Sequence, residues 1–340
     1  MNLKKLLNLG LVFAMFLAFN ASILAQTFYV NNQTGNDANP GTQALPKLTV
    51  GSAIIGAPGG STISVAATGV PYTEASITLT KVLTFTSTGG TPVFSNASLI
   101  VNEVVAGNTA FTGPFQFVNL TLTAGAVTGA SNLTFSGNVT RTAGTVDSQI
   151  KFTAGAHNFT YNGGVAITSG FELPAASNTT NFGNLTTVGA TVLTLNESKT
   201  MNGVLTTAAV LAVGSNTLTI VGANAHTIGG NVTGGTVAFT LTGASSITGA
   251  FTLPTVTATK TTNGLVALAL TNITAMTSLT ASGDASVNVT HAATIGAAGS
   301  SANNLVNNGD GIITVSTAGA VTVNGNVVNS GSGLTGAAGN

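Results

Sequence analysis

The sequence predicts an all-β fold wound as a parallel β-helix, a solenoid in which short strands stack coil upon coil. Along the chain, runs of four to six residues alternate an apolar residue with Thr, Ser or Asn, and Gly or Asn ends each run. Threonine, which is β-branched and favours extended backbone, occurs 58 times in 340 residues. Tryptophan is absent, and 16 Phe and 3 Tyr would supply β-sandwich cores, the competing architecture, only thinly. A solenoid interior takes small apolar residues and stacked polar ladders, so we favour it; coils of roughly 22 residues would give about 13 turns.

The expected strands share one pattern, in which apolar side chains fall on one face and hydroxyls on the other. The clearest runs are Ile77–Thr80, Leu83–Thr86, Leu120–Thr123, Leu133–Phe135, Phe159–Tyr161, Leu218–Ile220 and Val321–Val323. Gly and Asn supply the turns, because both residues tolerate positive φ. The tripeptide Gly-Asn-Val recurs at residues 137, 230 and 325, but no strict short period repeats, so we expect a degenerate repeat.

Residues 1–25 are typical of a secretory signal peptide. Lys4 and Lys5 precede an apolar stretch that ends near Phe19, and small residues lead to an expected cleavage after Ala25. The alternative is an N-terminal membrane anchor, but the apolar core is short for a span and no later stretch reaches 18 apolar residues. We therefore expect a protein that is secreted or held at the outer cell surface, with no transmembrane segment after cleavage.

Charge is scarce, with 8 Lys and Arg against 8 Asp and Glu in 340 residues. A net charge near zero excludes a strongly basic nucleic-acid binder. An apolar content of 44% argues against disorder. The absence of cysteine excludes disulfides and Cys-zinc sites. The fold must therefore be stabilised by burial and backbone pairing.

The segment after the signal peptide carries a family resemblance. The residues that carry it are Phe28–Asn31, Gly35–Thr42, Pro46–Val50, Ala53-Ile54, Gly60–Val65, Tyr72–Glu74 and Lys81–Phe85. This stretch resembles the entry segment of secreted bacterial right-handed parallel β-helix proteins of the pectate-lyase-like superfamily, although Ser61 stands where the family usually has Asp. The resemblance implies a first strand, an Asn/Asp/Gly turn, a short capping helix and the first coils.

Three segments follow from these observations. Residues 1–25 form the signal peptide, residues 26–60 the N-terminal strand, turn and capping segment, and residues 61–340 the β-helix. The expected capping helix is Leu48–Ala57, closed by Pro58-Gly59-Gly60. After Gly331 no capping helix or charged strand is recognisable, so we expect the front part of a longer protein; a flexible tail after an open end is the alternative.

The resemblance also implies possible chemistry, because relatives include polysaccharide lyases and glycoside hydrolases, which use clustered or paired carboxylates. Asp147, Glu172 and Glu197 are spaced 25 residues apart, with Lys151 and Lys199 nearby, so a 25-residue coil would stack the three acids about 4.8 Å apart. The simpler interpretation is isolated, solvated turn charges. We favour that interpretation and assign no catalytic residue.

Metal, cofactor and ice-binding signals are weak. Asn36-Asp37-Ala38-Asn39 can ligate calcium, but an Asx turn explains it equally well, and whether calcium binds near Asp37 stays open. His157, His226 and His291 are expected at the surface or in turns rather than at a metal. Thr-x-Thr pairs occur at irregular spacing, which argues against a flat ice-binding face. We assign no cofactor and no metal site.

The sequence thus favours a non-catalytic exported surface or extracellular module with a structural or adhesive role. Hydroxyl and amide side chains on an outer face would contact polysaccharide or other cell-surface components. The alternative is a carbohydrate-active enzyme, a polysaccharide lyase or glycoside hydrolase, on the same fold.

Overall fold

A computed structural model describes residues 25–103, 107–174, 182–260, 264, 266–290, 293–315, 321–331 and 333–336. The predicted signal peptide, apart from Ala25, lies outside the described residues. Strands make up 56% of the described residues and parallel sheets stack as a solenoid of about 12 turns, which confirms the all-β prediction. The chain divides into two compact units, a first unit of residues 1–118 and 124–134 and a second unit of residues 119–123 and 135–340.

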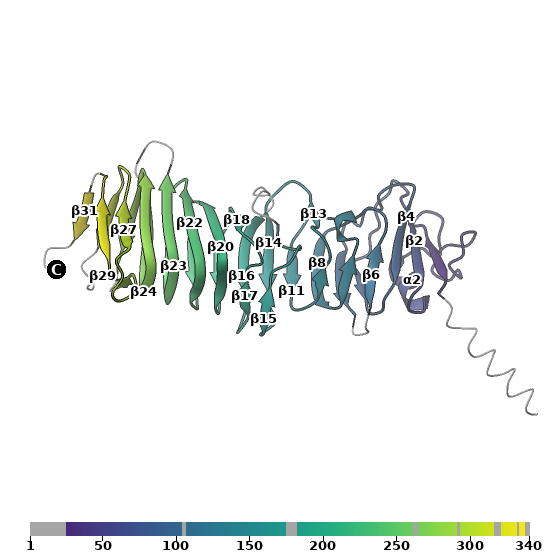
Figure 1. Ribbon diagram of the computed structural model, residues 1–340. Coiled ribbons are helices and arrows are strands. Elements are labelled where there is room, and N and C mark those ends of the chain that lie inside the picture. The colour runs from purple at the N-terminus through teal and green to yellow at the C-terminus, as the bar shows by residue number, and fades with distance from the viewer. Residues whose placement is uncertain are drawn as a thin grey trace, which may run out of the picture. The chain divides into compact units, whose positions relative to one another are not determined.

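The first unit is built from short parallel strands and one α-helix (Figure 1). Its elements are β1 (Thr27–Val30), α2 (Val50–Gly56), β2 (Thr62–Ala66), β3 (Ser76–Leu79), β4 (Thr84–Thr88), β5 (Ser98–Asn102), β6 (Asn108–Phe111), β7 (Phe115–Phe117), β9 (Ala126–Thr128), the 3-10 turn η2 (Ala130–Asn132) and the boundary strand β10 (Leu133–Phe135). One ladder runs β1–β2–β4–β6–β9 and another pairs β3 with β5, all parallel. Inside the unit, Tyr72, Phe94 and Phe117 stack with ring centroids 4.8 Å apart at each step.

The predicted capping helix is confirmed as α2, shorter by two residues at its start and one at its end. Thr49 caps it by accepting the Ser52 N–H, and Val50, Ala53 and Ile54 form its buried face. Two charges from the next coil complete its ends. The Glu74 carboxylate accepts the N–H groups of Val50 and Gly51, and the Lys81 ammonium donates to the Ala57 carbonyl at 2.7 Å. A negative charge at the N-terminus and a positive charge at the C-terminus complement the helix dipole.

The second unit holds the remaining strands, which lie side by side in Figure 1. They are β8 (Asn119–Ala124), β11 (Val139–Arg141), β12 (Thr145–Val146), β13 (Lys151–Phe152), β14 (His157–Tyr161), β15 (Ala166–Thr168), β16 (Phe182–Thr187), β17 (Val192–Thr194), β18 (Lys199–Met201), β19 (Leu205–Thr207), β20 (Leu211–Gly222), β21 (Ala225–Ile228), β22 (Val232–Leu241), β23 (Ser245–Lys260), β24 (Val266–Gly283), β25 (Ala285–Val289), β26 (Ala293–Ile295), β27 (Asn303–Asn307), β28 (Ile312–Val315), β29 (Val321–Val323), β30 (Asn326–Asn329) and β31 (Gly333–Gly336). Every expected strand run falls within one of the strands of the two units or overlaps it.

Three parallel ladders run through the second unit. The first ladder starts β8–β11–β14–β16–β19–β21–β23–β24. The second contains β15–β17–β20–β22, and the third runs β18–β20–β22–β23–β24. Strands β20, β22, β23 and β24 are long enough to bend from one ladder into the next, with register shifts at the corners.

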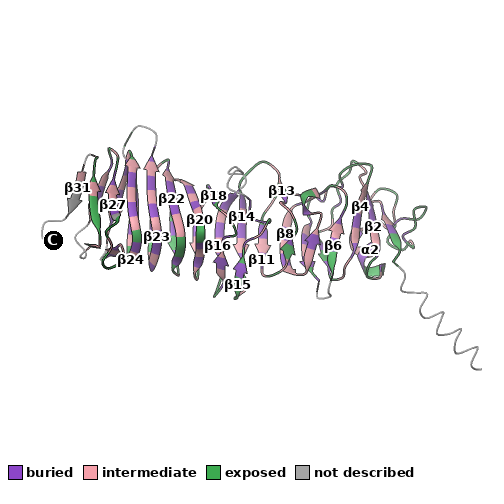
Figure 2. Ribbon diagram, in the orientation of Figure 1, coloured by how far each residue is buried: buried purple, intermediate pink, exposed green. Residues whose placement is uncertain are grey.

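Burial alternates along these strands, as the purple and pink bands of Figure 2 show. In β14 the pattern is strict, with His157, Phe159 and Tyr161 buried and the residues between them partly exposed. The interior is mostly Leu, Ile, Val, Phe and Ala. Because parallel strands repeat this alternation from coil to coil, apolar residues stack inside and Thr and Asn stack outside.

Candidate functional site

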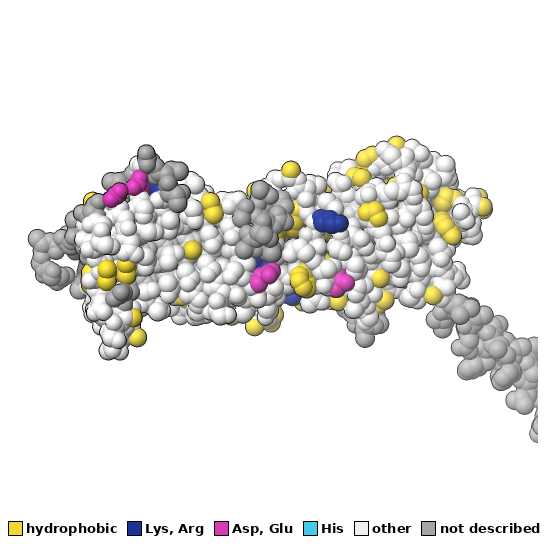
Figure 3. Space-filling view, turned by 45° about the horizontal axis from the view of Figure 1, so that its top comes forward, with side chains coloured by type: hydrophobic (Ala, Val, Ile, Leu, Met, Phe, Trp, Pro, Cys, Tyr) yellow, Lys and Arg dark blue, Asp and Glu magenta, His cyan; other side chains and the backbone are white. Residues whose placement is uncertain are grey.

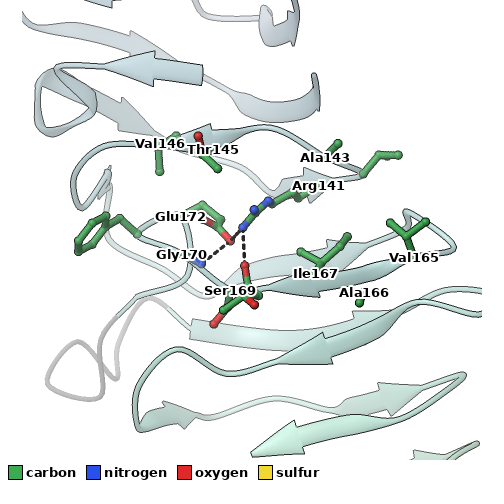
Figure 4. A pocket seen from close by; sticks show the side chains of 13 residues that line it. Arg141, Ala143, Thr145, Val146, Val165, Ala166, Ile167, Ser169, Gly170 and Glu172 are labelled. Atoms are coloured by element: carbon green, nitrogen blue, oxygen red, sulfur yellow. Dashed lines mark hydrogen bonds and ion pairs between the residues drawn. The ribbon is translucent and has the colours of Figure 1, made fainter. Parts of the chain in front are cut away.

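A cleft of the second unit lies beside β15, the strand at which the second ladder begins. Strand β15 pairs with β17 on one edge, and no described strand pairs with its other edge. There, a cleft of about 470 Å³ separates β15 from the turn and strand that carry Thr142–Val146. Figure 4 shows the side chains of Arg141 and Glu172 reaching into this space.

Arg141 occupies an inward position of β11. It lies in register with Leu122 on one side and Tyr161 on the other, and its residue is 7% exposed. Its Nη1 atom donates to a Glu172 carboxylate oxygen at 2.6 Å and to the Thr168 carbonyl at 3.0 Å. The ion pair is therefore buried at the base of the cleft, and it also binds the open edge of β15.

Glu172 is fully buried and gathers three donors on one oxygen. Its Oε1 atom accepts from Arg141, from the Tyr161 hydroxyl at 3.0 Å and from the Gly170 N–H at 2.9 Å. Its Oε2 atom and the Arg141 Nε atom have no hydrogen-bond partner. Burial, followed by the adjacent Glu172 carboxylate, raises the pKa of the Tyr161 phenol well above its usual range. The phenol therefore stays protonated and donates.

A second buried cation lies one coil further on. The Lys199 ammonium donates to the Leu173 carbonyl at 2.9 Å and to the half-exposed Glu197 carboxylate at 2.8 Å. Burial lowers the pKa of Lys199, and the nearby carboxylates of Glu197 and Glu172 oppose that shift. The ion pairs Arg141–Glu172 and Lys199–Glu197 thus leave little net charge in this part of the interior.

The three acids spaced 25 residues apart have different surroundings. Glu172 is buried and paired with Arg141, Glu197 is partly exposed and paired with Lys199, and Asp147 is exposed beside the Ser148 hydroxyl. The expectation of solvated turn charges is therefore wrong for Glu172. Glu172 is the one carboxylate that lines the cleft, and a second acid at glycosidase spacing is not among its lining residues. Lys151 starts β13 and is exposed.

Asp37 has a structural role in the first unit. One carboxylate oxygen accepts the N–H groups of Leu48 and Thr49, and the other accepts the Thr49 hydroxyl at 2.9 Å. The Asn36 side chain accepts the Ala38 N–H, which is the expected Asx turn. Chain donors thus occupy both oxygens of the carboxylate proposed for calcium.

Two of the three histidines contradict the prediction of surface positions. His157 is buried, and its two ring nitrogens lie 2.6 Å from the Gly137 carbonyl oxygen and 3.1 Å from that of Thr153. His226 is buried and its Nδ1 atom accepts the Leu205 N–H; burial lowers its pKa to about 4. His291 lies outside the described residues. Among the residues described, no three His, Cys, Asp or Glu side chains gather as a metal site.

An outer surface of the first ladder forms a second candidate site, which we name the amide–hydroxyl face. It contains four stacked Asn-x-Thr sequences, Asn119–Thr121, Asn138–Thr140, Asn158–Thr160 and Asn184–Thr186. Each asparagine side chain accepts a backbone N–H of the next coil at 2.6–3.2 Å. The threonine row continues in register through Thr206, Thr227, Thr248 and Thr271.

The third ladder carries a second hydroxyl array, which we name the β20–β24 lattice. Its rows are Thr217–Thr236–Thr255–Ser278, Thr219–Ala238–Thr257–Thr280 and Val221–Thr240–Thr259–Ser282. The parallel register therefore aligns threonines in rows although their spacing in the sequence is irregular. Coil length varies, with aligned asparagines 19, 20 and 26 residues apart in the amide–hydroxyl face, yet the strands stay in register because the turns absorb the difference.

The sequence analysis did not predict that Arg141 and Lys199 are buried, although the alternation of residues along their strands indicates it. In Val139-Thr140-Arg141 the arginine is two residues from a buried valine, and a period of two places it inside. Lys199-Thr200-Met201 repeats this arrangement. An apolar-polar alternation that places a charge at an inward position thus indicates a buried ion pair.

On the face shown in Figure 3, charged side chains are few. Comparison with family models, with curated proteins and with solved structures found no match. Of the helices in the described part of the chain, none is long and apolar enough to cross a membrane.

Proposed function

We propose that this chain is an exported, non-catalytic module of the cell surface or extracellular space, with a structural or adhesive role. We further propose that it contacts polysaccharide through the amide–hydroxyl face. The signal-peptide pattern of residues 1–25 supports export, and the resemblance of residues 28–85 supports a bacterial member of the pectate-lyase-like superfamily. The parallel solenoid is consistent with that superfamily.

The stacked Asn-x-Thr sequences carry the adhesive part of the proposal. Their neutral donors and acceptors repeat at the strand spacing of about 4.8 Å along the first ladder. Threonine is stiff at χ1, so its hydroxyl loses little freedom when it binds. Asn138 and Asn158 are held by hydrogen bonds to the next coil. A preorganised row of neutral hydrogen-bonding groups suits a ligand that presents hydroxyls in a repeating array.

The cleft supports the non-catalytic part of the proposal. Hydrolysis of a glycosidic bond needs two carboxyl groups in different protonation states on either side of the bond. Here Glu172 lines the cleft, and Arg141, Tyr161 and Gly170 engage its Oε1 atom. The alternative, a lyase or hydrolase, would need a second acid or a free base there.

The experiment compares two matched triple variants. T140A/T160A/T186A removes three aligned hydroxyls from the amide–hydroxyl face, and T219A/T257A/T280A removes three from the β20–β24 lattice. We expect depletion of wild-type protein by at least one insoluble polysaccharide of a panel. The first variant alone should lose at least about tenfold in affinity, from three hydrogen bonds. Equal binding by both variants, or no binding by wild type, contradicts the proposal.

The β20–β24 lattice favours a second candidate ligand, ice. Water molecules at a hydrogen-bond distance of about 2.75 Å in tetrahedral geometry place second neighbours about 4.5 Å apart, close to the strand spacing of about 4.8 Å. Ten of the twelve lattice positions are Thr or Ser, and none is charged. Inhibition of ice recrystallisation by wild type and by T140A/T160A/T186A, but not by T219A/T257A/T280A, would support this candidate, and no inhibition by wild type would reject it.

A further inference from the structure

The open edge of β15 presents backbone groups that a strand can use. In a parallel pair, alternate residues direct both their N–H and their C=O toward one neighbour. The Ser169 N–H donates to the Thr194 carbonyl, and Ile167 and Ala166 lie in register with Leu193 and Val192. Ile167 and Ser169 therefore face β17, so Ala166 and Thr168 face the cleft.

Three of these cleft-facing groups have no ladder partner. They are the N–H and C=O of Ala166 and the N–H of Thr168, because no described strand pairs with this edge. The fourth group, the Thr168 carbonyl, accepts from Arg141 at 3.0 Å. Exposed strand edges of this kind act as templates for an added strand. Because Arg141 occupies the Thr168 carbonyl, an added strand can pair with the β15 edge only up to the Thr168 N–H.

The walls of the cleft suit apolar side chains. Val146, Ile167, Val165 and Phe171 line it, and the last two are 58% and 47% exposed. Exposed valine and phenylalanine side chains around one cleft indicate a surface that a partner covers. Both residues are in the second unit, where Val165 directly precedes β15 and Phe171 follows it.

The base of the cleft favours an uncharged ligand. Arg141 and Glu172 neutralise each other, so a charged side chain would find no counter-ion. Glu172 Oε2 and Arg141 Nε remain without partners although both are buried. Neither atom is accessible from the cleft, so a ligand binds through the β15 edge and the apolar walls.

We propose that the cleft binds an extended, uncharged peptide segment of about three to four residues, with small apolar side chains at alternate positions, as an added strand on β15. The length follows from the three residues of β15 at about 3.3 Å each. This peptide-binding function is separate from the proposed contact with polysaccharide, which uses a different surface.

The test uses a fluorescein-labelled peptide of sequence Gly-Gly-Thr-Val-Thr-Val-Thr-amide and its analogue with N-methyl groups on alternate residues. Methylation removes the N–H donors of one edge but keeps the side chains. We expect saturable binding of the peptide by fluorescence anisotropy at micromolar to submillimolar protein, and binding about tenfold weaker for the analogue that lacks the donors facing β15. Absence of binding at about 1 mM, or equal affinity for both peptides, overturns the proposal.

A matched pair of protein variants tests the edge itself. Ala166→Pro removes the N–H that faces the cleft and leaves the β15–β17 hydrogen bonds in place, since Ile167 and Ser169 make those bonds. Ala166→Ser keeps the N–H. We expect about tenfold weaker peptide binding for A166P and wild-type affinity for A166S, both with wild-type circular dichroism. Unchanged affinity in a folded A166P overturns the proposal, and the methylated peptide decides the matter if A166P does not fold.

Discussion

The buried pair of Arg141 and Glu172 makes a quantitative prediction about stability. Replacing Arg141 by Met removes the cation and leaves the Glu172 carboxylate inside the second unit. At the 2.6 Å contact and an effective dielectric constant of 20, the direct attraction is about 6 kcal/mol. The Tyr161 hydroxyl and the Gly170 N–H still donate to Glu172, so part of the stabilisation stays. We therefore expect R141M to lower the free energy of unfolding by about 3–5 kcal/mol.

The assay is urea unfolding followed by far-ultraviolet circular dichroism, because the chain has no tryptophan. A neutral Gln in place of Glu172 provides the control. In R141M/E172Q the uncompensated charge is gone, so the double variant should be more stable than R141M by at least about 2 kcal/mol. A cost of less than about 1 kcal/mol for R141M, or a double variant no more stable than R141M, would refute the reasoning.

Three further predictions follow from other contacts. Burial lowers the pKa of His226 to about 4, below its unfolded value of about 6.5. The unfolded state therefore binds the proton first, and the free energy of unfolding falls by about 3 kcal/mol in total as pH drops from about 6.5 to 4. Urea midpoints should show this pH dependence in wild type and not in H226L, and a dependence that persists in H226L would contradict the prediction. Glu74→Gln should destabilise the first unit by about 1 kcal/mol, because the Glu74 carboxylate accepts the first N–H groups of α2. Lys81→Met should destabilise it by about 0.5–1 kcal/mol, because Lys81 donates to a carbonyl at the other end of the helix. Differential scanning calorimetry measures both effects, and no change in either variant would show that these charges do not stabilise the helix ends. Backbone and hydroxyl donors of the chain occupy the Asp37 carboxylate, so EDTA or millimolar calcium should shift the unfolding temperature by less than about 1 °C. D37A should lower the unfolding temperature by several degrees. A clear rise in the unfolding temperature with calcium would instead support a metal site at Asp37.

Local alternation was sufficient to predict the fold, because it fixes which side of a strand is buried. Runs such as Phe159–Tyr161 and Leu218–Ile220 fall within β14 and β20, and the helix predicted from Gly- and Pro-bounded residues is α2. Register between coils could not be predicted in the same way. Aligned asparagines lie 19, 20 or 26 residues apart, so a search for one period finds nothing although the hydrogen bonds are regular.

The candidate sites were less accessible from sequence, because they depend on which coils are neighbours. Glu172 was one of three acids chosen for equal spacing, but it lies in a turn, and its partner Arg141 lies 31 residues away on β11. The interruption between β12 and β15 has no local signature, since both strands keep apolar residues in an extended run. Asn-x-Thr sequences carry no information about which coils are neighbours, and only the parallel register reveals that four of them form one face.

Our central proposal is that this solenoid is exported and that it binds polysaccharide but does not cleave it. The most direct measurement incubates the protein with pectin-like and alginate-like polymers, with and without calcium, and follows unsaturated products and new reducing ends. The account predicts no product with any polymer under either condition, because Glu172 is held by Arg141 and lacks a second acid in the cleft. Turnover that is lost in E172Q would contradict it.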